Sequence, residues 1–269
     1  MRNQNWTAEA VVASVVALAF ATCLAAQSIT SSVISNIDLS KPFSTREAWR
    51  FIATQGPPVA GLYEEKEPGQ IQLCLRSDSS APCDPQLLNT PGDASSTNAS
   101  FMQPHYLNAV KIVYPRGSAD RPLLFVQTSS LHAGNGNQFV ATQVLAYENS
   151  QNRFLRIYQY TTGKNNNEEV RFISSGGLKG DIISIEPTEN APYGYWVTVN
   201  VLTPQYTYKM GLRYRSATHY GDNNSLAVID SEMPNIERHL GYWKSGMALP
   251  LPSGACPRPR LIRMELWCN

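Results

Sequence analysis

The chain has 269 residues, enough for one or two domains, and 42% of them are hydrophobic, which allows a substantial core. Charged residues make up only 16%, and Tyr, Thr, Ser, Asn and Gln fill the difference, a profile typical of strands with one solvated face. The formal net charge is +1 and the basic residues are scattered, so the sequence lacks the cluster of basic residues expected of a nucleic-acid-binding protein.

The N-terminal segment has the layout of a secretory signal peptide. Arg2 precedes an apolar run over residues 10–26 that ends in small residues, so the sequence predicts that residues 1–26 are a cleaved signal peptide. Two alternatives stay open: lipid attachment at Cys23, and retention of the segment as an anchor, which would need about 20 apolar residues. We therefore expect a periplasmic or extracellular protein whose mature chain contains no transmembrane span.

Four cysteines follow this segment, namely Cys74, Cys83, Cys256 and Cys268. In an exported chain they predict two disulfides, although the sequence alone permits three connectivities. The spacing favours local closure, Cys74 with Cys83 and Cys256 with Cys268, and each bond would stabilise the fold by about 2–3 kcal/mol through loop-closure entropy. A zinc site is the rival interpretation, but it would need closer Cys or His pairs than the sequence offers.

The segment over residues 27–76 is expected to lead into the main domain and to pack on it. Ser44 and Glu47 form a capping-box pattern that a Gly-Pro-Pro sequence follows, which together predict a short helix over Thr45–Gln55. Alternating apolar and polar residues then predict a first strand over Gln70–Arg76.

Residues 77–104 form the clearest boundary inside the chain. Their composition shifts to Ser, Asp, Pro, Asn, Ala and Gly without periodicity, which predicts a long flexible loop. The main antiparallel domain is then expected over residues 105–269. Its predicted strands, which turn signals separate, are Tyr106–Tyr114, Leu123–Thr128, Gln138–Tyr147, Phe154–Thr161, Glu168–Ile173, Asp181–Glu186, Tyr195–Leu202, Tyr206–Arg215 and Arg260–Trp267.

Two of these strands alternate between an apolar and a polar face. In the first, Val197 and Val199 share the apolar face, and Trp196 lies on the other. The side chains expected to share the apolar face of the second are Tyr206, Tyr208, Met210, Leu212 and Tyr214. Helical spacing of apolar residues predicts a second short helix that starts near Pro234.

These elements predict a mostly β fold. We expect an antiparallel meander of about eight to ten strands, closed as a barrel or doubled as a sandwich, with two short helices. A partial β-propeller is the alternative, although no blade repeat recurs at a fixed period. No nucleophile elbow, phosphate-binding glycine loop or His-Glu-x-x-His motif occurs, so the sequence leaves open whether the protein is an enzyme.

A run of asparagines and carboxylates enters one predicted strand. Asn166, Glu168 and Glu169 could ligate calcium, a hard cation that takes oxygen ligands. The simpler interpretation is a solvated hairpin turn, because Asn tolerates positive φ and the ligand alternation of an EF-hand is missing. Calcium is the one cofactor that the sequence suggests.

Two clusters could supply acid–base chemistry. His219 and Asp222 lie close enough in the sequence to share a proton or a ligand. Asp230, Glu232 and His239 follow, and carboxylates about 5–9 Å apart can hydrolyse a glycosidic bond as acid and base. Tight-turn chemistry explains the first cluster without any function, and a helix start explains the second, because carboxylates are favoured at the positive end of the helix dipole.

Aromatic side chains on polar faces are the third kind of candidate. Trp196 lies opposite the Tyr/Val face of its strand, and Tyr158 and Tyr160 are expected beside Arg156 on theirs. These residues could stack on sugar rings or anchor a protein partner. The alternative is that loops and helices cover both faces of the sheet.

We therefore weigh three functions. The preferred one is an exported, non-enzymatic binding or envelope-associated protein, with a carbohydrate or a protein as its partner and no nucleic acid. The alternative is an extracytoplasmic glycan hydrolase that uses the carboxylates and histidines named above. A calcium-stabilised structural module is the third.

Overall fold

The structure is a computed structural model, and it describes residues 31–60, 65–84, 103–115, 121–134, 136–163, 167–190, 192–216, 218–220, 225–244, 246, 259–262 and 265–268. Side chains are described up to residue 246, with those of residues 225–227 left out. The expected signal peptide, Cys256 and most of the expected loop over residues 77–104 lie outside the described residues.

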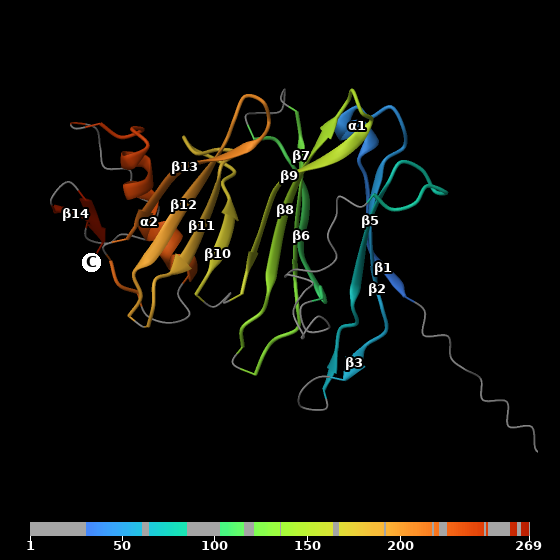
Figure 1. The fold of residues 1–269 in the computed structure, drawn as a ribbon, viewed down its shortest axis with the longest axis horizontal. Coiled ribbons are helices and arrows are strands. Elements are labelled where there is room, and N and C mark those ends of the chain that lie inside the picture. Colours follow the sequence, from blue (N-terminus) through green and yellow to red (C-terminus); the bar gives the residue numbers. More distant parts are fainter. Residues whose placement is uncertain are drawn as a thin grey trace, which may run out of the picture.

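Three antiparallel sheets contain most of the strands (Figure 1). The first sheet, in the order β1-β2-β5, comprises β1 (Ser32–Asp38), β2 (Arg50–Gln55) and β5 (Ile71–Arg76). The central sheet comprises β6 (Tyr106–Val113), β7 (Leu123–Ser129), β8 (Val140–Glu148) and β9 (Arg153–Thr162). The third sheet comprises β10 (Glu169–Phe172), β11 (Ile182–Pro187), β12 (Tyr195–Leu202) and β13 (Tyr208–Arg215).

Two hairpins and two helices complete the fold. The hairpins pair β3 (Val59–Ala60) with β4 (Lys66–Glu67), and β14 (Pro259–Ile262) with β15 (Glu265–Cys268). The helices are α1 (Ser40–Phe43) and α2 (Ser225–His239). In the part of the chain that the structure describes, neither helix is long and apolar enough to cross a membrane.

The sheets and α2 stack as successive layers, which are separated by three hydrophobic cores (Figure 1). Leu124 and Leu145 of the central sheet point into the first core, against the first sheet. Their neighbours Leu123 and Val144 point the other way, into the second core against the third sheet. Because both faces of β7 and β8 are buried, buried residues follow one another in these two strands instead of alternating with exposed ones.

The third core lies between the third sheet and α2. Tyr195, Val197 and Val199 of β12 are fully buried there, and Val228 and Ile236 of α2 pack on them. The helix therefore covers the outer face of the third sheet, while the opposite face of the same sheet is turned toward the central sheet.

The predicted mostly β, sandwich-like fold is confirmed. The strand expected over Tyr195–Leu202 has these same bounds, and the other strands expected between residues 106 and 215 are present with ends that shift by a few residues. Of the two expected forms, the structure has the sandwich: its sheets stack face to face, and no sheet closes into a barrel within the described ranges.

The predicted helix over Thr45–Gln55 is wrong. Ser44 has a positive φ of 49° and ends α1 instead of capping a new helix, and Arg50–Gln55 forms the central strand of the first sheet. Trp49, Phe51 and Ala53 alternate into the first core. Pairing with strands on both sides therefore overrides the local capping signal.

Two further expectations are corrected at the C-terminal end. The second helix begins at Ser225, so Pro234 lies inside it rather than at its start. The segment expected to be one strand over Arg260–Trp267 is the β14–β15 hairpin, in which Ile262 lies opposite Glu265. Folding back lets each short strand find its hydrogen-bonding partner within the segment.

The predicted local disulfide between Cys74 and Cys83 is confirmed, with an Sγ–Sγ distance of 2.08 Å. It ties the end of β5 to the segment that follows it. The expected partner bond from Cys256 to Cys268 lies outside the residues whose side chains are described.

Candidate functional site

An open cleft of about 450 Å³ lies between the central and third sheets. Strand β9 supplies one wall through consecutive residues from Ile157 to Tyr160. The opposite wall is a face of the third sheet, lined by Ser184, Glu186, Thr198, Asn200, Tyr208, Met210 and Arg213. Aromatic rings and short polar side chains converge here, the composition expected of a small-ligand site.

A β-bulge at Gly211 shapes the wall that β13 contributes. Leu212 pairs with Val199 and Met210 pairs with Asn200, so Gly211 is an extra residue that has no partner in β12. A Cβ atom at position 211 would lie 2.5 Å from Cγ2 of Val201, so only glycine fits without a shift of its neighbour. On either side of the bulge, side chains two residues apart therefore point to opposite faces of the sheet.

This bulge overturns one prediction. Tyr206, Tyr208, Met210, Leu212 and Tyr214 do not share one face. Tyr208 and Met210 line the cleft, whereas Leu212 and Tyr214 pack on the α2 side of the sheet. Alternation along a strand fails at an extra residue, and Gly211 was the only sequence signal for it.

A second bulge, at Ile157, shapes the opposite wall. Val144 pairs with Tyr158 and Leu145 pairs with Arg156, which leaves Ile157 as the extra residue. Tyr158 and Tyr160 lie on the cleft side of β9. Arg156 lies opposite Leu145, whose side chain is in the first core, so the prediction that Arg156 shares a face with the two tyrosines is wrong.

Tyr158 is the most buried aromatic residue of the cleft. Its side chain is only 9% exposed, and its ring centre lies 5.4 Å from that of Tyr208 in an edge-on arrangement. Its hydroxyl is buried and makes no hydrogen bond to any described residue. Burial, aided by the charge of Glu186, raises the pKa of Tyr158, so the hydroxyl stays protonated.

A chain of polar contacts forms the rim of the cleft. The Tyr160 hydroxyl donates a hydrogen bond to Glu186, and burial together with this carboxylate raises the pKa of Tyr160. Nη2 of Arg213 lies 4.0 Å from Oε2 of Glu186. The same guanidinium lies 4.9 Å from the centre of the Trp196 ring, which is 38% exposed. Tyr158 and Tyr160 thus line one cleft, Trp196 contacts its lining residue Arg213, and Arg156 does not line it.

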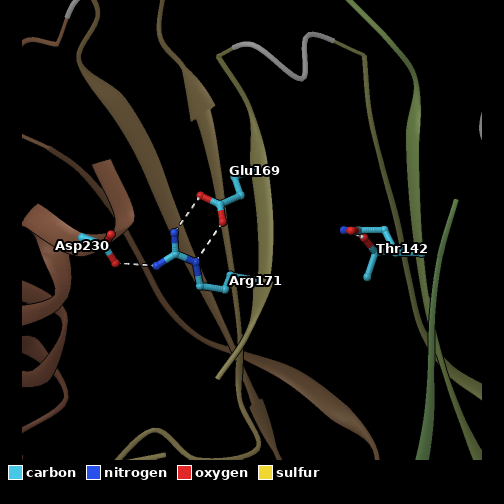
Figure 2. A network of polar contacts seen from close by, with 5 residues as sticks. Thr142, Glu169, Arg171 and Asp230 are labelled. Atoms are coloured by element: carbon cyan, nitrogen blue, oxygen red, sulfur yellow. Dashed lines mark hydrogen bonds and ion pairs between the residues drawn. The ribbon is translucent and has the colours of Figure 1, made fainter. Parts of the chain in front are cut away.

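The other predicted residues are distributed over different contacts. Figure 2 shows Arg171 of β10 between Glu169 and Asp230. Its Nε donates to Glu169 at 2.8 Å, and its Nη1 donates to Asp230 at 2.5 Å. Burial raises the pKa of Glu169, and Arg171 opposes this shift. Arg171 therefore joins Glu169, a predicted metal ligand, to Asp230, a predicted catalytic residue, and attaches α2 to the third sheet.

Glu232 has a separate set of partners, although it is two residues from Asp230. It is 1% exposed and lies between α2 and β13. Tyr214 and Tyr220 donate to its carboxylate at 2.7 Å and 3.2 Å, and Nδ2 of Asn235 donates at 3.2 Å. These donors satisfy a carboxylate that burial would otherwise penalise.

Of the remaining predicted residues, His239 touches this cluster through Tyr214. His239 is exposed, and its ring packs beside that of Tyr214 at 4.7 Å. His219 is also exposed, and Asp222 lies outside the described residues. The structure therefore brings Glu232 and His239 near one tyrosine, but it does not gather the predicted acid–base residues in one cleft.

The predicted calcium ligands are dispersed as well. Glu168 accepts a hydrogen bond from the backbone N–H of Gly163 at 2.8 Å, and Glu169 binds Arg171. Asn166 lies outside the described residues. Among the residues with described placement, no group of three or more His, Cys, Asp or Glu residues could hold a metal ion.

Comparison with known proteins finds no family model that matches this chain, no similar curated protein and no similar solved structure.

Proposed function

We propose that this chain is an exported, non-enzymatic binding protein that holds a small polar ligand in the cleft between β9 and the third sheet. One observation carries the proposal: Tyr158 lines the cleft, and its buried hydroxyl has no hydrogen-bonding partner among the described residues. A buried polar group left unpaired costs about 1–3 kcal/mol, and a ligand that pairs with it recovers that cost.

Export is supported by features outside the cleft. The N-terminal segment has the positive start, apolar centre and small-residue end of a signal peptide. The disulfide between Cys74 and Cys83 is compatible with an oxidising compartment.

The composition of the cleft favours binding over glycan hydrolysis. Most glycoside hydrolases place a pair of carboxyl groups across the scissile bond. Glu186 is the one carboxylate among the described lining residues, and Tyr160 and Arg213 already contact it. Asp230 and Glu232 are engaged elsewhere, with Arg171 and with buried tyrosines.

A thermal-shift screen of chemically diverse small molecules tests the proposal. A ligand that binds only the folded protein raises Tm with concentration. We expect at least one compound to raise Tm of the wild-type chain and to lose this effect in Asn200→Ala, which changes the cleft wall. Gln72→Ala is the matched control, because Gln72 is an exposed amide on β5 of the first sheet, away from this cleft. The proposal fails if no compound raises Tm, or if the effect survives Asn200→Ala and is lost in Gln72→Ala.

A further inference from the structure

Resting on the proposed function of the cleft, we infer that its ligand is a neutral saccharide, which is recognised by amide and hydroxyl side chains and packs against the tyrosines. Charge balance is the first argument. Glu186 and Arg213 lie 4.0 Å apart and compensate each other, and the other lining residues are uncharged. The cleft therefore has no unpaired charge that would offset the cost of desolvating an ionic ligand.

The kind of polar group is the second argument. Asn200 presents both amide donors and a carbonyl acceptor, and the hydroxyls of Thr198 and Tyr158 can both donate and accept. Ligand hydroxyls have the same dual character. A phosphate or carboxylate offers acceptors only, so it would pair with the donors of these side chains and leave their acceptor oxygens without a donor.

The apolar part of the cleft is the third argument. Tyr158 of β9 and Tyr208 of β13 pack edge to face across the cleft, and Met210, on the β13 wall, is 64% exposed. Rings and a flexible thioether can cover the C–H face of a sugar while polar groups at their edges bind its hydroxyls. The cleft therefore offers contacts to both the apolar and the polar surface of a sugar ring.

The wall geometry favours a saccharide over a peptide. A peptide strand binds chiefly through backbone hydrogen bonds at a sheet edge. Here β9 is an edge of the central sheet, but the other wall is the face of β11–β13, which presents side chains. Recognition by side chains from a sheet face suits a ligand with many hydroxyl groups.

The test compares matched ligand classes by isothermal titration calorimetry on the full chain. The panel holds neutral oligosaccharides, uronic-acid oligosaccharides of the same length, and short uncharged peptides. We expect a neutral oligosaccharide to bind with a Kd that is unchanged by added salt, because ionic contacts are screened and neutral hydrogen bonds are not. Tyr158→Phe should weaken its binding by about fivefold, the loss of one neutral hydrogen bond.

The outcomes separate this inference from the proposed function. If a uronic-acid oligosaccharide or a peptide binds instead, and Tyr158→Phe weakens it, the inference of a neutral saccharide is overturned while the binding function stands. If no member of any class binds, both are overturned. Tyr158→Phe removes a hydroxyl without a hydrogen-bonding partner among the described residues, so its Tm should not fall, which distinguishes lost ligand contact from lost folding.

Discussion

The guanidinium of Arg213 lies 4.9 Å from the centre of the Trp196 ring, at the rim of the cleft between the central and third sheets. The same arginine approaches Glu186, so one side chain links the exposed indole to the carboxylate that Tyr160 contacts. Arg213 points to this side of the sheet because it follows the Gly211 bulge. A ligand that moves Arg213 in the cleft would therefore alter the surroundings of the fluorescent Trp196 ring.

Ligand binding should alter the emission of Trp196. A ligand that displaces Arg213 or contacts the indole changes the polarity around a ring that is 38% exposed. We expect a saturable change in tryptophan fluorescence that disappears in Trp196→Phe. Trp49→Phe, which alters a tryptophan buried in the first core, should keep the signal. Loss of the signal in Trp49→Phe alone would place the ligand away from the cleft.

Two tyrosine hydroxyls should differ sharply in their effect on stability. Tyr214→Phe removes a 2.7 Å hydrogen bond to the buried carboxylate of Glu232, so we expect the free energy of unfolding to fall by about 1–3 kcal/mol. Tyr158→Phe removes a hydroxyl that pairs with no described residue, so stability should stay within about 0.5 kcal/mol or rise. Urea denaturation measures both. Equal losses in the two variants would contradict this assignment of partners.

The Gly211 bulge should tolerate no larger residue. Gly211→Ala places a Cβ atom 2.5 Å from Val201, and we expect a loss of about 1–3 kcal/mol together with weaker ligand binding. Gly134→Ala is the control, since a Cβ atom there meets nothing within 4 Å. Adding Val201→Ala to Gly211→Ala should restore part of the stability. A Gly211→Ala variant as stable as wild type would mean that the bulge does not depend on glycine.

Alkaline pH should destabilise the fold through tyrosines whose pKa is raised in the folded state. Burial raises the pKa of Tyr106 from 10.0 to about 12, and the hydrogen bond that it donates to Glu67 adds to the shift. Burial likewise raises the pKa of Tyr214. Because these folded-state values lie above the unfolded value, their contribution to stability is fully present below pH 10 and is lost as the pH rises toward the folded values.

We therefore expect the free energy of unfolding to fall above pH 10, with a shallower fall in Tyr106→Phe. Tyrosinate absorbance, recorded with stability across the same pH range, checks the order of ionisation. An unchanged slope in Tyr106→Phe would show that this residue titrates alike in the folded and unfolded states.

Periodicity in the sequence predicted the strands well, because pairing and burial leave the alternation of apolar residues intact over most of their length. The alternation also placed Trp196 opposite the Val197 and Val199 face, where its ring contacts Arg213 of the cleft. The central sheet was harder to interpret, since a sheet buried on both faces has no polar face to mark its partners.

The cleft itself could not be derived from period-2 alternation. The bulges at Ile157 and Gly211 each shift the alternation of side chains by one residue. As a result, Arg156 points away from the cleft and Met210 lines it. Arg171 was missed because its two partners, Glu169 and Asp230, come together only when α2 packs beside the third sheet. The false helix over Thr45–Gln55 had the local signals of a cap but the tertiary environment of a central strand.

The cleft between β9 and the third sheet is the proposed ligand site. The most direct measurement is a crystal structure of the protein with the saccharide that binds most tightly in solution. We predict a sugar in the cleft, with one hydroxyl within hydrogen-bonding distance of the Tyr158 hydroxyl and another near the Asn200 amide. A sugar bound instead on the first sheet, beside Gln72 and Arg76, would contradict the claim.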